Sequence, residues 1–379
     1  MANDDLGAAA AAKADEFYTQ WPVIEREMNA YLEYDPDVFR GKTILLPCDD
    51  PEWSNFTKFF ALHFMDYGLK KLISTSYAPE ANHGGVYYTP TLFDDPQFDH
   101  TKDEVAGKLF VLEAKDINGD GKINIDDLQW QYLKGDGDFR SAEVTALRDE
   151  ADIIVTNPPF SLFREFMAWI MAAGKQFSII GNMNAVTYKE VFPLIMGNKV
   201  WYGPTISSGD REFGVPDHYP LDAAGWRVDD DGKKYIRVKG VRWFTNIEHG
   251  RRHEPLQLMT MADNIKFNKK LKGQPYRRYD NYDAIEVPFT DAIPSDYDGP
   301  MGVPISFLDR YNPDQFEILG MPSNHPDTDL RTRVYTAEEC RDAYFTLFGK
   351  PGVYDLNARG VVGGVKVYAR ILIQRKAAQ

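Results

Sequence analysis

A turn of four residues, Asn157-Pro158-Pro159-Phe160, follows the strand-like segment 152–156 and carries residue types that could activate a planar amine. Such an amine, for example the exocyclic amine of adenine, is a poor nucleophile because its lone pair is delocalised into the ring. Two acceptors on its two hydrogens would draw the nitrogen toward a tetrahedral geometry and free that lone pair. The side-chain oxygen of Asn157 and the main-chain oxygen of Pro158 can be these acceptors, since proline fixes φ and so aims its carbonyl. The four residues are therefore the candidate catalytic residues.

The aromatic ring of Phe160 suits a base that has left the stack of a nucleic acid. A base inside a duplex cannot be reached, so it must be turned out, and an aromatic face compensates for the stacking it loses. Transfer of a methyl group from a sulfonium needs positioning and a water-poor site, without a metal or a covalent intermediate. The same turn also serves the methylation of RNA bases and of glutamine side chains, so it indicates the reaction better than the substrate.

The elements that must position this turn alternate between strand-like and helix-like segments over the first half of the chain. The strand-like segments are 44–48, 72–76, 109–112, 152–156 and 177–180. Ser54 and Gly68 are predicted to begin and end a helix after the first of them, and Ser161 to cap a helix after the catalytic turn. This alternation predicts an α/β fold with a mostly parallel sheet and helices on both faces. Ligands bind at the carboxyl ends of such strands, so the turns 48–54 and 157–160 are predicted to share one edge.

The composition changes after about residue 200, where Gly and Pro become frequent and aromatic and basic residues interleave. Three segments there are predicted to form antiparallel β-structure: 201–202, 238–244 and 368–373. The residues 229–232 are predicted to form a hairpin turn.

The charge of the chain is distributed unevenly. The net charge of −14 opposes nucleic-acid binding when it is taken globally. Residues 232–279, however, hold 13 Lys and Arg against 3 Asp and Glu, so this segment carries +10 and the rest of the chain −24. Such asymmetry predicts a face directed at a polyanion, and a solvated basic surface without a partner is the alternative. The candidate DNA-binding residues are Arg242, Arg251, Arg252, Lys269, Lys270, Arg277 and Arg278.

The remaining composition indicates a globular protein of a reducing compartment. Hydrophobic residues make up 43% and aromatic residues 13% of the chain, and no apolar run reaches the roughly 18 residues of a membrane span. The two cysteines, Cys48 and Cys340, cannot build a framework of disulfides or zinc sites, which fits the cytoplasm. The Ala-rich residues 1–13 lack the pattern of a signal peptide, and we expect a flexible tail.

The segment 116–127 matches a calcium loop of the EF-hand or dockerin type. The ligand positions of that pattern are occupied by Asp116, Asn118, Asp120, Asn124 and Asp127, and Gly121 stands at the turn. Asp127 replaces the usual closing glutamate, which weakens bidentate closure. A structural calcium ion is one interpretation, and an acidic hairpin without a metal is the favoured one. We expect no catalytic metal, because methyl transfer gains nothing from it.

Several segments together resemble the EcoRI-type family of adenine-specific DNA methyltransferases. Besides the catalytic turn, they are collinear over almost the whole chain: 15–19, 47–56, 68–72, 135–141, 161–164, 208–213, 242–246, 302–305, 312–317 and 368–373. The resemblance implies a Rossmann-like S-adenosylmethionine-dependent methyltransferase fold with a C-terminal mixed, β-rich target-recognition region. We expect the catalytic domain at 14–230 and the DNA target-recognition region, with strands that return to the core, at 231–379.

The resemblance also implies S-adenosyl-L-methionine as the cofactor. By their positions in the family pattern, the residues expected to bind the cofactor are Tyr18, Thr19, Asp49, Asp50, Ser54, Asn55, Phe56, Thr75, Ser76, Asp138 and Phe139. The glycine-rich turn usual in methyltransferases is replaced here by 47–54. Asp138 would accept from the adenine amine of the cofactor with Phe139 against its ring, and Tyr18 and Thr19 would close over the methionine end.

The expected function is therefore the transfer of a methyl group from S-adenosylmethionine to the 6-amino group of a flipped adenine at specific sites in duplex DNA. The setting would be restriction–modification or protection of phage or host DNA. We expect a cytoplasmic monomer of bacterial or phage origin that binds double-stranded DNA and no membrane, with a cognate restriction endonuclease as a further candidate partner. Two alternatives stay open: a methyltransferase of the same fold that acts on RNA or a protein amide, and a non-enzymatic calcium- or DNA-binding module.

Overall fold

The computed structural model describes most of the chain in two compact units. The described residues are 17–50, 54–78, 99–103, 105–205, 210–215, 219, 221, 225–323 and 328–376. The first unit comprises 1–191 and 200–250, and the second comprises 192–199 and 251–379. The expected tail, 1–13, lies outside the described residues.

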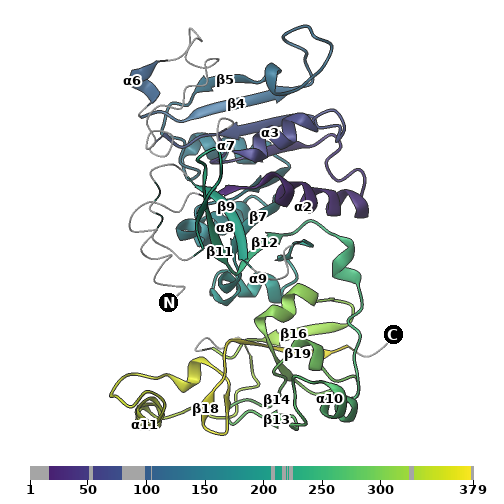
Figure 1. Cartoon of the computed structure of the whole chain (residues 1–379), viewed down its shortest axis with the longest axis vertical. Coiled ribbons are helices and arrows are strands. Elements are labelled where there is room, and N and C mark those ends of the chain that lie inside the picture. The colour runs from purple at the N-terminus through teal and green to yellow at the C-terminus, as the bar shows by residue number, and fades with distance from the viewer. Residues whose placement is uncertain are drawn as a thin grey trace. The chain divides into compact units, whose positions relative to one another are not determined.

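An eight-stranded sheet with the order β5-β4-β3-β2-β6-β7-β12-β8 forms the core of the first unit (Figure 1). Its strands are β2 (Thr43–Leu46), β3 (Lys71–Thr75), β4 (Lys108–Glu113), β5 (Gln129–Tyr132), β6 (Ile153–Thr156), β7 (Gln176–Asn182), β8 (Trp201–Tyr202) and β12 (Val241–Thr245). The four inner strands β3, β2, β6 and β7 are parallel. The outer strands all pair antiparallel with their neighbours.

The prediction of a mostly parallel sheet is thus right for the four inner strands and wrong for the four outer ones. The sheet is mixed. The strand predicted at 109–112 runs against β3, and β5 follows it as an antiparallel neighbour. The segment 76–107 separates β3 from β4, so the direction of β4 follows from its pairing and not from a short connection. β12 follows β11 after a tight turn at Gly240, whose φ is +69°, and pairs antiparallel with β7.

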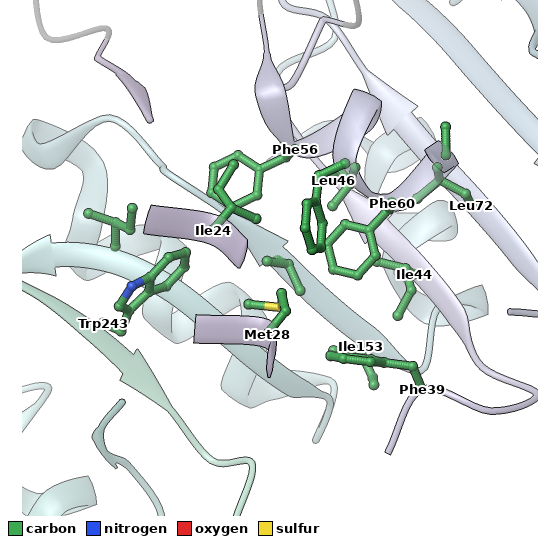
Figure 2. Close-up of a cluster of buried hydrophobic side chains, with 14 of the residues drawn as sticks. Ile24, Met28, Phe39, Ile44, Leu46, Phe56, Phe60, Leu72, Ile153 and Trp243 are labelled. Atoms are coloured by element: carbon green, nitrogen blue, oxygen red, sulfur yellow. The ribbon is translucent and has the colours of Figure 1, made fainter. Parts of the chain in front are cut away.

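Helices cover both faces of this sheet. On one face, α2 (Trp21–Tyr34) and α3 (Asn55–Leu62) bury their apolar sides in the main hydrophobic core. Figure 2 shows Phe56 and Phe60 of α3 packed with Ile44 and Leu46 of β2, and Trp243 of β12 near Ile24 and Phe56. Side chains alternate between the two faces of a strand, so residues i and i+2 of β2 share this core.

The other face carries α7 (Ala142–Glu150) and α8 (Phe163–Ala172), which are joined by a hydrogen bond from Trp169 to Thr145 of 3.1 Å. Phe163 packs on Phe244 of β12 with a centroid distance of 5.0 Å. A Cβ at Gly181 of β7 would lie 2.3 Å from the ring of Phe163, so only glycine lets α8 approach the strand this closely.

A four-stranded antiparallel sheet lies in the same unit as the turn 157–160. Its order is β1-β9-β11-β10, with β1 (Tyr18–Thr19), β9 (Asp210–Val215), β10 (Arg227–Val228) and β11 (Lys234–Lys239). The hairpin turn predicted at 229–232 is confirmed: it joins β10 to β11, with Gly232 at φ +83°. Thr19 pairs with Phe213, which ties the start of the described chain to this sheet.

The second unit contains a five-stranded sheet with the order β13-β14-β15-β19-β16. Its strands are β13 (Arg277–Arg278), β14 (Ile285–Glu286), β15 (Met301–Pro304), β16 (Phe316–Gly320) and β19 (Arg370–Arg375), and a separate hairpin is made by β17 (Val361–Val362) and β18 (Val365–Lys366). The helices are α9 (Phe192–Met196), α10 (Met261–Phe267) and α11 (Ala337–Phe348), while the short α6 (His100–Asp103) belongs to the first unit. Among the helices described, none is long and apolar enough to cross a membrane.

The compact units divide at Gly250, whereas the boundary expected from the sequence lies at residue 230. The twenty residues between these positions belong to the first unit for a physical reason. β11 completes the small antiparallel sheet, and β12 pairs with β7 at the edge of the parallel strands. Composition changes in this region, but backbone pairing keeps it with the first unit.

Candidate active site

The two polar turns predicted to share an edge do lie side by side. β2 and β6 are adjacent parallel strands, and the turns follow their carboxyl ends. The hydroxyl of Thr156, the last residue of β6, donates a hydrogen bond of 2.9 Å to the main-chain oxygen of Pro47 after β2. This bond joins the start of the candidate catalytic turn to the turn expected to hold the cofactor. The edge is where ligands bind in open α/β sheets.

The amide nitrogen of Asn157 is held by a hydrogen bond, and its amide oxygen remains available to a ligand. Its Nδ2 donates to the main-chain oxygen of Phe17 at 2.6 Å. Its Oδ1 is buried and accepts no hydrogen bond from the residues that the structure describes. A buried acceptor without a donor costs about 1–3 kcal/mol, which a donor from a substrate would offset. The side chain is therefore oriented and ready to accept an N–H.

The rest of the turn is rigid. Pro158 is buried, and Pro159 precedes the 3-10 turn η2 (Phe160–Leu162), closed by a bond from the Leu162 N–H to the Pro159 oxygen of 3.0 Å. The prediction that Ser161 caps the following helix is wrong. α8 begins at Phe163, and its N-cap position is Leu162, because the 3-10 turn takes up the first residues after the prolines.

Phe17 is a residue of this site that the sequence did not single out. Its carbonyl holds Asn157, and its ring meets Phe160 edge-on with a centroid distance of 5.5 Å. The same ring contacts Phe213 at 5.8 Å and Tyr219 at 6.3 Å. Phe17 lies inside the segment 15–19 that matches the family, so its neighbourhood was indicated although its role was not.

The turn after β2 is built around Asp49. Its N–H donates to the Thr75 oxygen at 2.7 Å, and the hydroxyls of Thr57 and Ser74 donate to its main-chain oxygen. Ser54 donates to Oδ1 of the Asp49 carboxylate at 2.7 Å and also caps α3 through the Phe56 N–H. The second carboxylate oxygen, Oδ2, is buried without a hydrogen bond from the described residues.

The carboxylate of Asp49 therefore has an oxygen that a positively charged ligand group could pair with. Burial raises the pKa of Asp49 to about 7, although the hydroxyls of Thr156 and Ser54 lower it. The Thr156 hydroxyl donates to the Pro47 oxygen, and Oδ2 accepts no hydrogen bond from the described residues. An ammonium group beside Oδ2 would stabilise the ionised form, as an opposite charge does at short range.

Thr19 adds a third buried oxygen to the same edge. Its Oγ1 has no hydrogen-bond partner among the described residues, and the residue is 3% exposed. Asn55, the first residue of α3, donates to the Thr19 main-chain oxygen at 2.8 Å. Thr19, Asp49 and Asn157 thus present unsatisfied oxygens from three segments that hydrogen bonds link together. This arrangement fits a polar ligand with several donors.

The remaining cofactor candidates have structural partners. Thr75 accepts from the Cys48 N–H at 3.3 Å, and Ser76 accepts from the Lys108 N–H at 2.9 Å, so these hydroxyls hold the ends of β3 and β4. Main-chain atoms come very close here: a Cβ at Gly137, whose φ is +86°, would lie 2.1 Å from the Ser76 oxygen. This approach brings the segment 135–139 beside the end of β3.

Asp138 and Phe139 are both engaged by neighbours. Arg140 donates to the two carboxylate oxygens of Asp138 from Nε at 2.9 Å and from Nη2 at 2.5 Å, and it lowers the pKa of that carboxyl. Phe139 is 2% exposed and packs on Phe166 and Trp169 with centroid distances of 4.9 and 5.6 Å. A ligand at Asp138 would have to share the carboxylate with Arg140.

The predicted DNA-binding residues separate into buried and exposed ones. Arg242 in the first unit and Arg252 in the second are each 4% exposed, which leaves their guanidinium groups little surface for a phosphate. Arg242 lies over the ring of Tyr202 at 5.8 Å and donates to the Val241 oxygen. The others belong to the second unit; Arg251 is partly buried, and the exposed ones are Lys269, Lys270, Arg277 and Arg278.

The segment 116–127, which matches a calcium-loop pattern, is held by its own main chain. Both oxygens of Asp116 accept main-chain N–H groups, from Gly119 and Gly121. Asp127 is 2% exposed and accepts from the N–H groups of Ile117, Asn118 and Asn124. In the part of the chain that the structure describes, no group of three His, Cys, Asp or Glu is placed to hold a metal. The two carboxylates act here as loop-closing acceptors.

Comparison with known proteins agrees with the resemblance found in the sequence. A family model described as adenine-specific methyltransferase EcoRI matches residues 5–376. The chain is 41% identical over 330 residues to the Type II methyltransferase M.EcoRI of Escherichia coli, an alignment that covers 86% of this chain and 92% of that protein.

Two mycoplasma proteins are also similar to the chain. The Type II methyltransferase M.MpnI of Mycoplasma pneumoniae is 35% identical over 331 residues, covering 86% of this chain and 89% of that protein. The Type II methyltransferase M.MgeORF184P of Mycoplasma genitalium is 32% identical over 370 residues, covering 97% and 98%. No solved structure matches the chain. The family resemblance is confirmed, and the chain belongs to the family of the adenine-specific methyltransferase EcoRI.

Proposed function

We propose that the chain transfers a methyl group from S-adenosylmethionine to the 6-amino group of an adenine turned out of duplex DNA. One observation carries the proposal: the buried, unsatisfied Oδ1 of Asn157 stands at the carboxyl end of β6, beside the Pro158 carbonyl, in a member of an adenine-specific methyltransferase family. These two oxygens are the acceptors that activation of the amine requires.

Asn157 acts through its fixed orientation. The hydrogen bond to Phe17 prevents the amide from turning its nitrogen toward the substrate. Oδ1 accepts a hydrogen bond from one N–H of the amine, the Pro158 oxygen accepts one from the other N–H, and the nitrogen lone pair is directed away from both oxygens. Removal of one preorganised group of this kind typically lowers the reaction rate by about 10²–10³-fold.

The unsatisfied oxygens at the edge fit the methionine part of the cofactor. We assign the α-ammonium of S-adenosylmethionine to Asp49 Oδ2, with the Thr19 hydroxyl as a further polar partner. When bound, the cofactor supplies an electrophilic methyl group on its sulfonium. The four parallel strands and the position of these turns support a Rossmann-like methyltransferase fold for the first unit.

The second unit offers exposed cations for the phosphates of DNA. Lys270 pairs with Asp291 at 2.7 Å, and Arg278 pairs with Asp283. Both pairs are exposed, so a phosphate can replace the carboxylate at small cost. We propose that Lys269, Lys270, Arg277 and Arg278 contact DNA, and that methylation protects a specific sequence from a cognate endonuclease.

A substrate comparison with purified protein tests this function. The protein is incubated with S-adenosylmethionine carrying a labelled methyl group and with duplex DNA, RNA or a mixed protein extract in separate reactions. We expect label in the DNA alone, recovered as 6-methyladenine after digestion. Label in RNA or protein with none in duplex DNA would overturn the proposal and favour the same chemistry on another planar nitrogen.

A further inference from the structure

The second unit contains a cavity of about 400 Å³ whose chemistry the proposed methyl transfer does not use. Its volume lies within the range of about 300–1,000 Å³ that small-ligand sites occupy. The lining comes from three segments of the unit: 270–277, then Glu286 with Pro288 and Phe289, and the hairpin of β17 and β18. All of them are far in sequence from the catalytic turn.

Much of the lining of the cavity is apolar. Val362, Val365 and Val367 of the hairpin region line it together with the ring of Phe289. Val365 is 51% exposed and Phe289 is 36% exposed, so both present apolar surface to solvent, and the Lys270 Nζ lies over the Phe289 ring at 5.7 Å. Tyr276 also lines the cavity, and its hydroxyl donates to the Ala292 oxygen at 2.6 Å, which fixes the ring. Such surfaces suit a planar base, because stacking and apolar contact do not depend on its identity.

The charge of the cavity is positive. Glu286 also lines it, but two hydrogen bonds from Arg370, of 2.6 and 2.9 Å, neutralise that carboxylate. Lys270 pairs with Asp291 at the surface. Arg277 makes no side-chain hydrogen bond or ion pair with the described residues, so its charge is available to a ligand. A guanidinium of this kind binds phosphate through paired N–H donors.

The hairpin is shaped to make room for Arg277. Its turn residues Gly363 and Gly364 have φ of +58° and +78°, the conformation of a type I′ turn. A Cβ at Gly363 would lie 2.2 Å from the Arg277 Nη2, so the guanidinium passes directly over a glycine. Glycine thereby keeps the cation at the cavity and the valines of the hairpin on its wall.

We infer that this cavity binds one nucleotide unit, with the base against Phe289 and Val365 and the phosphate on Arg277 and Lys270. The inference rests on the proposed function, since the expected source is a nucleotide of the bound DNA other than the adenine that is methylated. Rotation of that nucleotide out of the stack would let the second unit sense a further base of the bound DNA. A free nucleotide is the other source with the same chemistry.

The test uses the whole 379-residue chain and duplexes that carry its methylation sequence, with the fluorescent adenine analogue 2-aminopurine placed at one position at a time. Its fluorescence rises when the base leaves the stack. We expect a rise at the methylated position and at one second position. Phe289→Ala should remove the second rise and keep the first. A parallel calorimetric titration with thymidine monophosphate measures the affinity of the protein for a free nucleotide.

Two variants separate the cavity from general charge effects. Arg277→Gln should weaken nucleotide binding by about tenfold, the order expected from one lost charged hydrogen-bond pair. Lys366→Gln changes a cation of the same hairpin that lies over the Tyr354 ring at 4.2 Å and does not line the cavity, and it should leave binding unchanged.

The outcomes are distinct. A second rise that Phe289→Ala removes supports a nucleotide from DNA, and binding of thymidine monophosphate that Phe289→Ala removes supports a free nucleotide. Methylation and a single rise at the target, with no binding of the free nucleotide, would overturn the inference while the proposed function stands. Absence of methylation and of every rise would instead refute the proposed function.

Discussion

Polar groups differ in burial and pairing between the edge of the sheet in the first unit and the basic surface of the second unit. We use the term basic surface for the exposed Lys269, Lys270, Arg277 and Arg278. At the edge, Thr19, Asp49 and Asn157 each have one buried oxygen without a donor among the described residues. On the basic surface, Lys270 and Arg278 are exposed and already paired with carboxylates. Buried unsatisfied groups cost stability and select one ligand geometry, whereas exposed pairs exchange readily. The first arrangement suits chemistry, and the second suits binding along a polyanion.

Asn157→Ala should give the largest effect and tests the first half of this contrast. The variant loses the acceptor for the amine, and we expect methyl transfer to fall by at least about 100-fold. The melting temperature should change little, because the lost bond to Phe17 is partly offset by removal of a buried unsatisfied oxygen. Initial rates with labelled cofactor and thermal melting measure both.

Asn182→Ala is the matched control for that variant. Asn182 ends β7, the parallel neighbour of β6, and accepts the Asn184 N–H at 2.9 Å. It should retain full activity. Loss of activity in both variants to the same degree would show that any asparagine at this edge is needed for structure, and the contrast between the two regions would fail.

Asp49→Asn should give the second-largest effect, and this effect should appear in the pH dependence of cofactor binding. Because the pKa of Asp49 is raised to about 7, the folded protein without cofactor binds a proton more tightly than the unfolded chain does. This contribution to stability is present at low pH and is lost as the pH rises through about 7. The pH dependence of cofactor affinity has the opposite sign, because the ammonium binds the ionised carboxylate more tightly than the protonated one.

Affinity for S-adenosylmethionine should therefore rise about tenfold between about pH 6 and about pH 8 in the wild type, and stay flat in Asp49→Asn. Calorimetric titrations across this range measure it. Asp152→Asn is the control, because Asp152 accepts the Thr43 N–H at the opposite end of the same strands. A wild-type affinity that does not change with pH would contradict the assignment of the ammonium to Asp49.

Lys269→Gln should have a smaller effect that sharpens the second half of the contrast. Removal of one phosphate contact weakens DNA binding equally for all sequences and reduces the slope of log affinity against log salt by about 1. Fluorescence anisotropy at several salt concentrations measures the slope. Lys350→Gln, an exposed lysine outside the basic segment, should leave the slope unchanged.

Asp127→Asn should have the smallest effect on function. Main-chain N–H groups, first that of Ile117, lower the pKa of Asp127, so its stabilisation is present at neutral pH and is lost as the pH falls through its lowered pKa. We expect a melting temperature lower by a few degrees with methyl transfer unchanged. Thermal melting in the presence of a chelator or of calcium checks the loop further: a large shift on adding calcium would reveal a metal site there.

The proposed catalytic turn could be placed beside its neighbouring turn from the sequence because it consists of contiguous residues. Asn157 to Phe160 form one short segment, and the rule that ligands bind at strand ends correctly predicts that this segment lies beside the turn at Asp49. Phe17 could not be found in this way, because its contribution to Asn157 is a main-chain oxygen, which no residue type encodes.

The sequence was a weaker guide to strand direction and to exposure. The apolar run 109–112 predicts a strand, but its direction depends on pairing with β3 and β5, which a local pattern does not contain. A count of cations likewise cannot separate Arg252, at 4% exposure, from the exposed Lys269 in the same basic segment. Burial is a property of the packed chain, and only the structure distinguishes these residues.

In the proposed mechanism, the unsatisfied oxygen of Asn157 activates an adenine in DNA. The most direct measurement is long-read sequencing of genomic DNA from a methylation-free host that expresses the wild type, Asn157→Ala or Asn182→Ala. The proposed mechanism predicts 6-methyladenine at one defined sequence with the wild type and Asn182→Ala, and none with Asn157→Ala. Methylation of the same sequence by Asn157→Ala would contradict it.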